Sequence, residues 1–302
     1  MRVAIGTVVT SADDVEFVLD AERLGADSVW VPEVWGADAL TPLAYLAART
    51  SRIGLASGIV QLGARTPANL AMAAMSLQQL SGGRFRLGVG TSGPQVMEGW
   101  HGVRFTSPIA ATRETIEIVR IVARGDKLAL DGRVYQLPLP DGPGRSIRSM
   151  LPPTTVPIYV AALGPKNLQL TGELADGWLG NAFLPEYAEE FLGHLRTGAE
   201  RAGRTLADLD LLMPVAVEVT DDVEEAAEPP RHGPVGRRGD RTVLHVPEPA
   251  PLLTDDAPPH RRRPGIYAQD RMSLAGSHEH DLRLPPEPLP CTTFYMLYGA
   301  SP

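Results

Sequence analysis

The sequence contains a single cysteine, Cys291, and no apolar run as long as the roughly 20 residues that span a bilayer. One cysteine excludes an internal disulfide framework and is typical of a protein of the reducing cytoplasm. No basic and apolar leader follows Met1, so the sequence predicts no targeting segment. A formal net charge of −8 offers no attraction to nucleic acid or anionic lipid. We therefore expect a cytoplasmic protein without nucleic-acid or membrane partners.

Signatures of several enzyme classes are also missing. The sequence has no HExxH or CxxC metal motif, no GxSxG nucleophile elbow and no Walker phosphate loop. His101 and His194 are the only histidines in residues 1–228, so we predict no metal site there. Gly88 and Gly90 lack a third glycine and a helix directly after them, which makes a weak dinucleotide fingerprint.

Strand-like and helical segments alternate strictly through residues 1–228. Apolar, β-branched runs predict seven strands, and six segments with helical periodicity lie between them. Alternation predicts a parallel sheet with right-handed crossovers, and seven units exceed half of a doubly wound sheet. We therefore predict an α/β fold, a (β/α)8 TIM barrel whose eighth unit should follow residue 228. The strands are expected at residues 2–9, 27–33, 52–62, 84–90, 156–163, 176–183 and 209–220.

Composition changes abruptly after Glu228. Residues 229–302 hold 14 of the 28 prolines, and proline removes backbone donors and blocks regular structure. Lys127 and Lys166 are the only lysines among 28 basic residues, an arginine bias that points to GC-rich coding. The tail is then a disordered appendage, a Pro-rich docking segment or a product of a frameshift. We favour the frameshift, because the change falls where the eighth barrel unit is due, which leaves strands one and seven unpaired.

Two strand ends carry residues suited to a phosphate-bearing planar cofactor. Active sites of such barrels lie at the C-terminal ends of the strands. After strand four, the small residues Gly90, Thr91 and Ser92 allow a ring or phosphate tail close to the backbone. After strand five, a helix begins at Pro165, so the amides of Lys166, Asn167 and Leu168 and the Lys166 charge favour an anion. A simple Gly-Pro helix start is the alternative.

Two further residues are candidates for chemistry. Glu33 follows strand two, where it is either a functional acid or a solvated one. His101 lies in the excursion after strand four, where it is a proton donor, a hydrogen-bond partner for a ring, or a packing histidine. The position of each residue in the sequence does not by itself decide between its alternatives.

Five segments together resemble the luciferase-like monooxygenase superfamily, and within it the oxidoreductases that use the deazaflavin coenzyme F420. The resemblance covers about residues 1–228. The segments, in chain order, are GADSVWVPEVWG, the SGI of strand three, SLQQLSGGRFRLGVG, GPQVMEGWHGV and IYVAALGPKNLQLTGELADGWL.

The resemblance implies an (α/β)8 barrel with an insertion before strand five, here about residues 126–155 with a hairpin turned at Asp131-Gly132. It implies a cofactor ring over the end of strand three, with a non-prolyl cis peptide within Ser57–Ile59, and a phosphate held at the strand-five loop. The chemistry implied is hydride transfer between F420 and a small organic substrate, in a homodimer. The cofactor-binding residues expected are Ser57, Gly58, Ile59, Gly90, Thr91, Ser92, Ala162, Gly164, Lys166 and Asn167.

The chain departs from the sugar-phosphate dehydrogenases of this superfamily. These carry a histidine after strand two and a catalytic glutamate after strand four, where this chain has Glu33 and Thr91-Ser92. Glu33 and His101 are therefore our candidates for proton handling. Two alternatives stay open: an FMN-dependent monooxygenase using reduced flavin and oxygen, and an inactive product or a binding protein with a Pro-rich docking tail.

Overall fold

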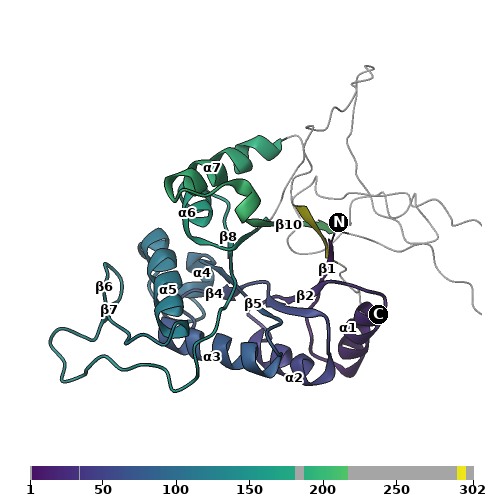
Figure 1. Ribbon diagram of the computed structural model, residues 1–302, viewed down its shortest axis with the longest axis horizontal. Helices are drawn as coiled ribbons and strands as arrows, with labels where there is room; N and C mark the ends of the chain where they lie inside the picture. Colours follow the sequence, from purple (N-terminus) through teal and green to yellow (C-terminus); the bar gives the residue numbers. More distant parts are fainter. Residues whose placement is uncertain (1, 34, 181–186, 217–290, 297–302) are drawn as a thin grey trace, which may run out of the picture.

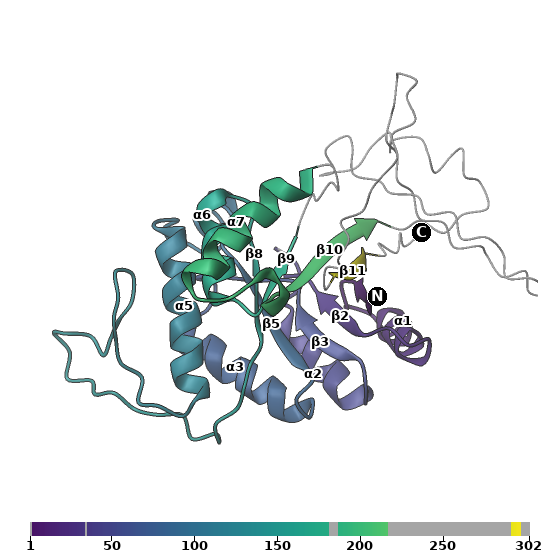
Figure 2. The same cartoon turned by 45° about the horizontal axis from the view of Figure 1, so that its top comes forward.

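A ring of parallel strands forms the centre of the molecule (Figures 1 and 2). The computed structural model describes residues 2–33, 35–180, 187–216 and 291–296. The sheet order is β3-β2-β1-β11-β10-β9-β8-β5-β4, and an additional β3–β5 pairing closes the ring, which confirms the predicted TIM barrel. Its strands are β1 (Arg2–Gly6), β2 (Ser28–Val31), β3 (Gly54–Ser57), β4 (Val60–Gln61), β5 (Phe85–Gly90), β8 (Ile158–Ala161), β9 (Gly177–Leu179), β10 (Asp210–Ala216) and β11 (Cys291–Met296).

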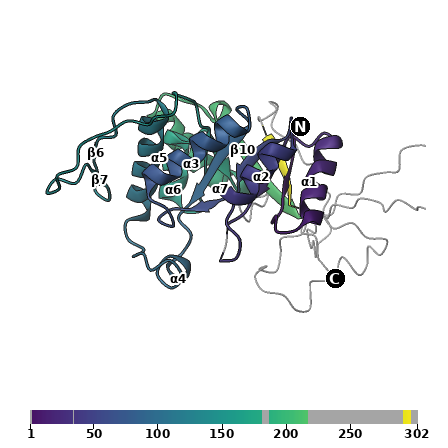
Figure 3. The same ribbon diagram turned by 90° about the horizontal axis from the view of Figure 1, so that it is seen from below.

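Helices cover the outside of the ring, and their starts follow local sequence rules. Ser11 and Asp14 form a capping box at the first helix, and Thr66 caps the third helix ahead of a proline at its start. The helices are α1 (Ala12–Arg23), α2 (Leu40–Arg49), α3 (Pro67–Leu80), α4 (Pro94–Met97), α5 (Pro108–Ala123), α6 (Pro165–Leu174) and α7 (Ala188–Arg201). The single turn α4 was not expected; it stands off the barrel, apart from the helix layer (Figure 3).

Two apolar cores result from the alternation of side chains along each strand. The larger core lies between the strands and the helices. The smaller one fills the inside of the ring, where the edge of Trp30 meets Tyr159 with ring centroids 5.0 Å apart. Beside it, at the N-terminal ends of the strands, Tyr159 Oη donates to Asp210 Oδ2 over 2.9 Å and Arg2 pairs with Asp210 at 2.7 Å. This end of the barrel is therefore filled.

The predicted open edge between strands one and seven is occupied. β11 pairs in parallel with β1 and with β10, so the expectation that both edges are unpaired is corrected. Periodicity failed here because proline-rich sequence precedes a run of only six residues, CTTFYM, whose composition nonetheless suits a strand.

The insertion of residues 126–155 forms an arm beyond α5 (Figure 1). Its strands β6 (Leu130–Asp131) and β7 (Gln136–Leu137) pair antiparallel, as predicted for a hairpin. The connection is Gly132–Tyr135 rather than the expected two-residue turn. The cause is Glu114 of α5, whose buried carboxylate accepts the backbone N–H groups of Arg133, Val134 and Tyr135.

The other sequence predictions for the tail fall outside the described residues. They concern residues 229–290 and 297–302, and include the disordered or out-of-frame tail and the domain boundary at 228. None of the helices in the described ranges is long and apolar enough to cross a membrane.

Candidate active site

An open pocket of about 700 Å³ lies at the C-terminal ends of β5 and β8. This volume is in the range of small-molecule sites, which span about 300–1,000 Å³. Eight of the ten expected cofactor-binding residues line it: Ile59, Gly90, Thr91, Ser92, Ala162, Gly164, Lys166 and Asn167. Pro108 and Ile109, at the start of α5, also line it; the Thr-Ser-Pro helix start was the only sequence signal for them.

The end of β3 has the backbone geometry that the resemblance implied. The peptide bond between Gly58 and Ile59 is cis, within the predicted Ser57–Ile59 range. Ser57 and Gly58 do not line the pocket. The buried Ser57 hydroxyl instead donates to Gly88 O and accepts from Gly88 N, both at 2.9 Å. A Cβ on Gly88 would lie 2.0 Å from Ser57 O, so a glycine is required for this close approach.

Small residues shape the β5 side of the pocket. A Cβ on Gly90 would lie 2.8 Å from Ile59 Cδ1, so the missing side chain leaves room for Ile59. Ser92 has a left-handed backbone with φ of 55°. This conformation is uncommon outside glycine and is enriched at ligand sites. The loop therefore presents backbone more than side chain to the pocket.

The β8 side of the pocket carries polar groups without partners. Gly164 O accepts from the amides of both Asn167 and Leu168 at 3.0 Å, so of the three amides expected to point outward only that of Lys166 lacks a partner among the described residues. Asn167 is 8% exposed, and its Oδ1 has no hydrogen-bond partner within the described structure. The Lys166 ammonium forms no ion pair with any described acidic side chain. A negatively charged group in the pocket would meet two free donors, the Lys166 ammonium and the Lys166 amide, whereas Asn167 Oδ1 is an acceptor that a donor of the ligand would satisfy.

Glu33 is buried, 8% exposed, and its carboxylate is fully engaged. Arg65 donates to its two oxygens at 2.7 and 2.8 Å, and the Ala39 amide donates to Oε2 at 3.2 Å. Arg65 also lies 3.7 Å from Asp38 in the same loop. The Glu33 hydrogen bond raises the pKa of Arg65, which keeps the ion pair charged. This arrangement fixes the loop after β2.

His101 is joined to Glu33 through Gln61 of β4. Gln61 Nε2 donates to Glu33 O over 3.1 Å, which leaves Gln61 Oε1 as an acceptor. His101 Nε2 lies 2.6 Å from that oxygen and must carry the proton, an assignment that follows from the bonding pattern. The Nδ1 atom has no partner within the described residues. Gln61 was not singled out by the sequence, because its role depends on two residues distant in the chain.

The pocket residues fit a flat, anionic cofactor. Backbone-rich walls at Gly90–Ser92 suit a planar group, while the ammonium and the backbone amide of Lys166 supply donors for a negatively charged one. No group of three His, Cys, Asp or Glu side chains suited to a metal ion occurs among the described residues.

Comparison with known proteins defines the class. The model of the luciferase-like monooxygenase family matches residues 3–270, so the chain belongs to that family. A Mycobacterium tuberculosis protein named as a coenzyme F420-dependent oxidoreductase is 44% identical over 216 residues, covering 68% of this chain and 62% of that protein. The F420-dependent glucose-6-phosphate dehydrogenase of Kribbella flavida is 33% identical over 231 residues, covering 72% of this chain and 67% of that protein.

A solved structure shows the same architecture. The coenzyme F420-dependent tetrahydromethanopterin reductase from Methanopyrus kandleri superposes with a TM-score of 0.64 at 24% identity, covering 71% of this chain and 66% of that chain. The chain spans about 62% of the length of the Mycobacterium tuberculosis relative that it matches.

Proposed function

We propose that the chain is an oxidoreductase that transfers a hydride between coenzyme F420 and a small organic substrate. Membership of the family, the names of the relatives and the composition of the 700 Å³ pocket support this function. When bound, F420 supplies an obligate two-electron carrier, and the protein contributes placement and electrostatics.

Different residues of the pocket would bind the ring and the phosphate of the cofactor. Ile59, following the cis peptide, and Gly90 would form the surface for the ring, because neither presents a polar side chain there. Lys166 would hold the phosphate through its ammonium and its backbone amide, at the N-terminal end of α6 where the helix dipole favours an anion. Asn167 Oδ1 would accept a hydrogen bond from a hydroxyl or N–H group of the cofactor.

His101 is the better candidate of the two for handling the proton that accompanies hydride transfer. Its Nε2 is committed to Gln61, which leaves Nδ1 able to exchange a proton with a substrate oxygen or nitrogen. Glu33 has both carboxylate oxygens bonded to Arg65. Its engagement favours a positioning role, in which it orients Gln61 and thereby His101.

The observation that carries this proposal is Lys166, the cationic side chain among the described residues that line the pocket, together with its unpaired backbone amide at the start of α6. Titration of the protein with F420 and, separately, with FMN tests it by the change in cofactor fluorescence. We expect F420 to bind more tightly. Preferential binding of FMN would replace the proposal with the flavin-dependent monooxygenase. A folded chain that binds neither would indicate the inactive or binding-protein alternative.

The resemblance also supports a homodimer and a small-molecule substrate. Both belong to this proposal, as does the cytoplasmic location that the single cysteine favours. Light scattering of the purified chain measures the molar mass and tests the dimer directly.

A further inference from the structure

The four tryptophans fall into two pairs. Trp30 and Trp178 are buried, and their indole N–H groups donate to Ser28 Oγ at 3.0 Å and to Ala162 O at 2.9 Å. Trp35 and Trp100 are 62% and 64% exposed. A tryptophan carries one of the largest apolar surfaces of any side chain, so two of them left in water mark a surface for binding.

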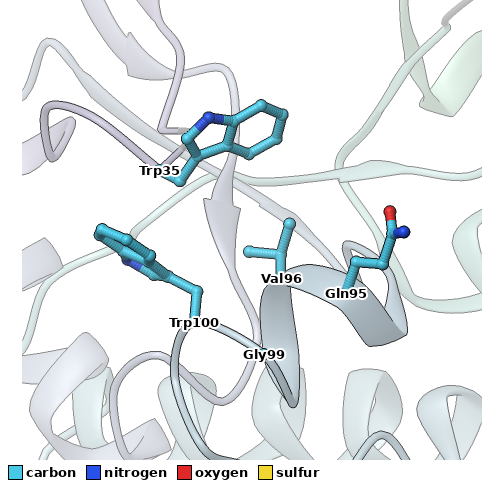
Figure 4. A pocket seen from close by; sticks show the side chains of 5 residues that line it. All are labelled: Trp35, Gln95, Val96, Gly99 and Trp100. Atoms are coloured by element: carbon cyan, nitrogen blue, oxygen red, sulfur yellow. The ribbon is translucent and has the colours of Figure 1, made fainter.

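The exposed tryptophans share one pocket. It has a volume of about 310 Å³ and is lined by Trp35, Gln95, Val96, Gly99 and Trp100. Figure 4 shows the two indoles around a single opening, with the Val96 side chain directed toward Trp35. A Cβ on Gly99 would lie 2.5 Å from Gln95 O, so glycine is needed for the tight turn that carries Trp100.

A hydrogen-bonded chain holds the two tryptophan loops together. Trp35 is two residues after Glu33, and Trp100 is directly before His101. Because Gln61 bonds to both Glu33 O and His101 Nε2, the two loops are held in register. The two loops are thereby fixed relative to each other before a ligand arrives, which lowers the entropic cost of binding.

The tryptophan pocket and the cofactor pocket are connected by short segments of chain. Ser92 is a lining residue of the larger pocket, and three residues later Gln95 of α4 lines the smaller one. The Glu33 amide donates to Ile59 O over 3.2 Å, so the Trp35 loop is bonded to the segment beneath the cofactor pocket. Both pockets lie on the C-terminal side of the strands, where these barrels carry out their chemistry.

The chemistry of the lining selects the ligand. Each of the five lining residues is uncharged, and Gln95 supplies a single amide. Two indole faces favour a flat or apolar ring, and the absence of a lining charge gives no partner for a phosphate or carboxylate. We propose that Trp35 and Trp100 bind the ring of a neutral aromatic substrate of the reaction proposed above. The description of the ligand as a substrate rests on the proposed function, whereas binding at this site is tested separately.

Binding of 1-naphthol to the full chain tests this inference by isothermal titration calorimetry. We expect Trp35→Ser and Trp100→Ser each to weaken 1-naphthol binding about tenfold, since each removes one stacking face. Tyr45→Ser is the matched control, because Tyr45 is an exposed ring, 51% exposed, on the outer helix α2. It should leave the affinity unchanged. Glucose 6-phosphate serves as the charged probe and should bind more weakly than 1-naphthol.

Titration with F420 on the same variants separates the two proposals. Trp-dependent 1-naphthol binding with intact F420 binding supports both. Trp-dependent 1-naphthol binding in a chain that does not bind F420 supports the tryptophan site and overturns the proposed function. If 1-naphthol binding is absent, or equal in the tryptophan variants and the wild type while circular dichroism shows all chains folded, the tryptophan site is wrong whatever F420 does. Tighter binding of glucose 6-phosphate at this site also overturns it.

Discussion

At the N-terminal ends of the barrel strands, Arg2 and Tyr159 each bond to Asp210 beside the buried ring of Trp30. At the C-terminal ends, Lys166 and Asn167 line a pocket, and neither the Lys166 ammonium nor Asn167 Oδ1 has a partner among the described residues. Polar side chains thus serve different purposes at the two ends of the barrel, and their hydrogen bonding and burial distinguish these purposes. Polar groups that are satisfied stabilise the barrel, whereas unsatisfied ones are available to a ligand.

The tryptophans provide the strongest test of this difference between the two ends. Trp30→Ala should lower the free energy of unfolding by about 3–5 kcal/mol, because it empties a site inside the barrel. Trp35→Ala should change it by no more than about 0.5 kcal/mol, because the side chain is largely exposed. Urea unfolding followed by circular dichroism measures both. Equal losses for the two variants would contradict the assignment of Trp35 to binding.

Tyr159 tests the filled end. Tyr159→Phe should cost about 1–3 kcal/mol of unfolding free energy, because it leaves Asp210 with one donor fewer in a partly buried place. Affinity for F420 should stay the same, because Tyr159 lies at the opposite end of the strands. A loss of F420 binding in a folded variant would show that the two ends are coupled.

Tyr159 also makes the free energy of unfolding depend on pH. Burial, together with the negative charge of Asp210, raises the pKa of the Tyr159 phenol above its ordinary value of 10.0. The neutral phenol therefore contributes stability that is complete below pH 10 and is lost as pH rises toward the folded-state pKa. Unfolding free energy measured between pH 8 and 11 should fall more steeply in the wild type than in Tyr159→Phe. Parallel curves would contradict this prediction.

Lys166 tests the open end. Lys166→Gln should weaken F420 binding by about tenfold, as expected for loss of a hydrogen bond to a charged group. The effect should shrink as salt is added, because the contact is exposed. Lys127→Gln is the matched control, since Lys127 is the other lysine of the chain and lies in the arm. Equal effects of the two replacements would place the anion elsewhere.

A replacement in the helix layer should have the smallest effect on the free energy of unfolding. Arg113 of α5 donates to both carboxylate oxygens of Glu173 of α6 at 2.8 and 2.7 Å, and these bonds lower the pKa of Glu173 below its ordinary value of 4.5. Glu173→Gln should cost about 0.5–1 kcal/mol at pH 7, because the pair is partly exposed. The stabilisation by the ionised carboxylate is present above pH 4.5 and is lost as pH falls through the folded-state pKa. The variant and the wild type should therefore converge in acid, as urea unfolding at pH 7 and pH 3 can measure.

Local sequence was sufficient for most of the barrel and for the walls of its pocket. Alternating periods identified the strands through β10, and the residues following β5 and β8 were named because strand ends of parallel sheets meet at one edge. The pairing of β11 was missed, since it joins residues far apart in the chain and its flanking prolines obscured a short strand. The division at residue 228 remains a prediction, which translation of the encoding DNA in all frames would test.

The partners of side chains were harder to predict than their positions. Glu33 was identified, but its ion pair with Arg65 depends on how the loops after β2 and β4 fold toward each other. Trp35 lies in the segment GADSVWVPEVWG that carries the resemblance, yet nothing in the sequence joined it to Trp100. Spacing indicates which strand end a residue occupies, whereas contacts between different loops require the tertiary structure.

The linkage of Glu33, Gln61 and His101 has a consequence for protein engineering. These residues fix the loops through hydrogen bonds, while the exposed Trp35, Gln95 and Trp100 line the tryptophan pocket without taking part in those bonds. A combinatorial library confined to those three exposed positions would therefore vary the recognition surface while leaving its scaffold intact. Selection from such a library could redirect the substrate range of this barrel without a search for compensating mutations.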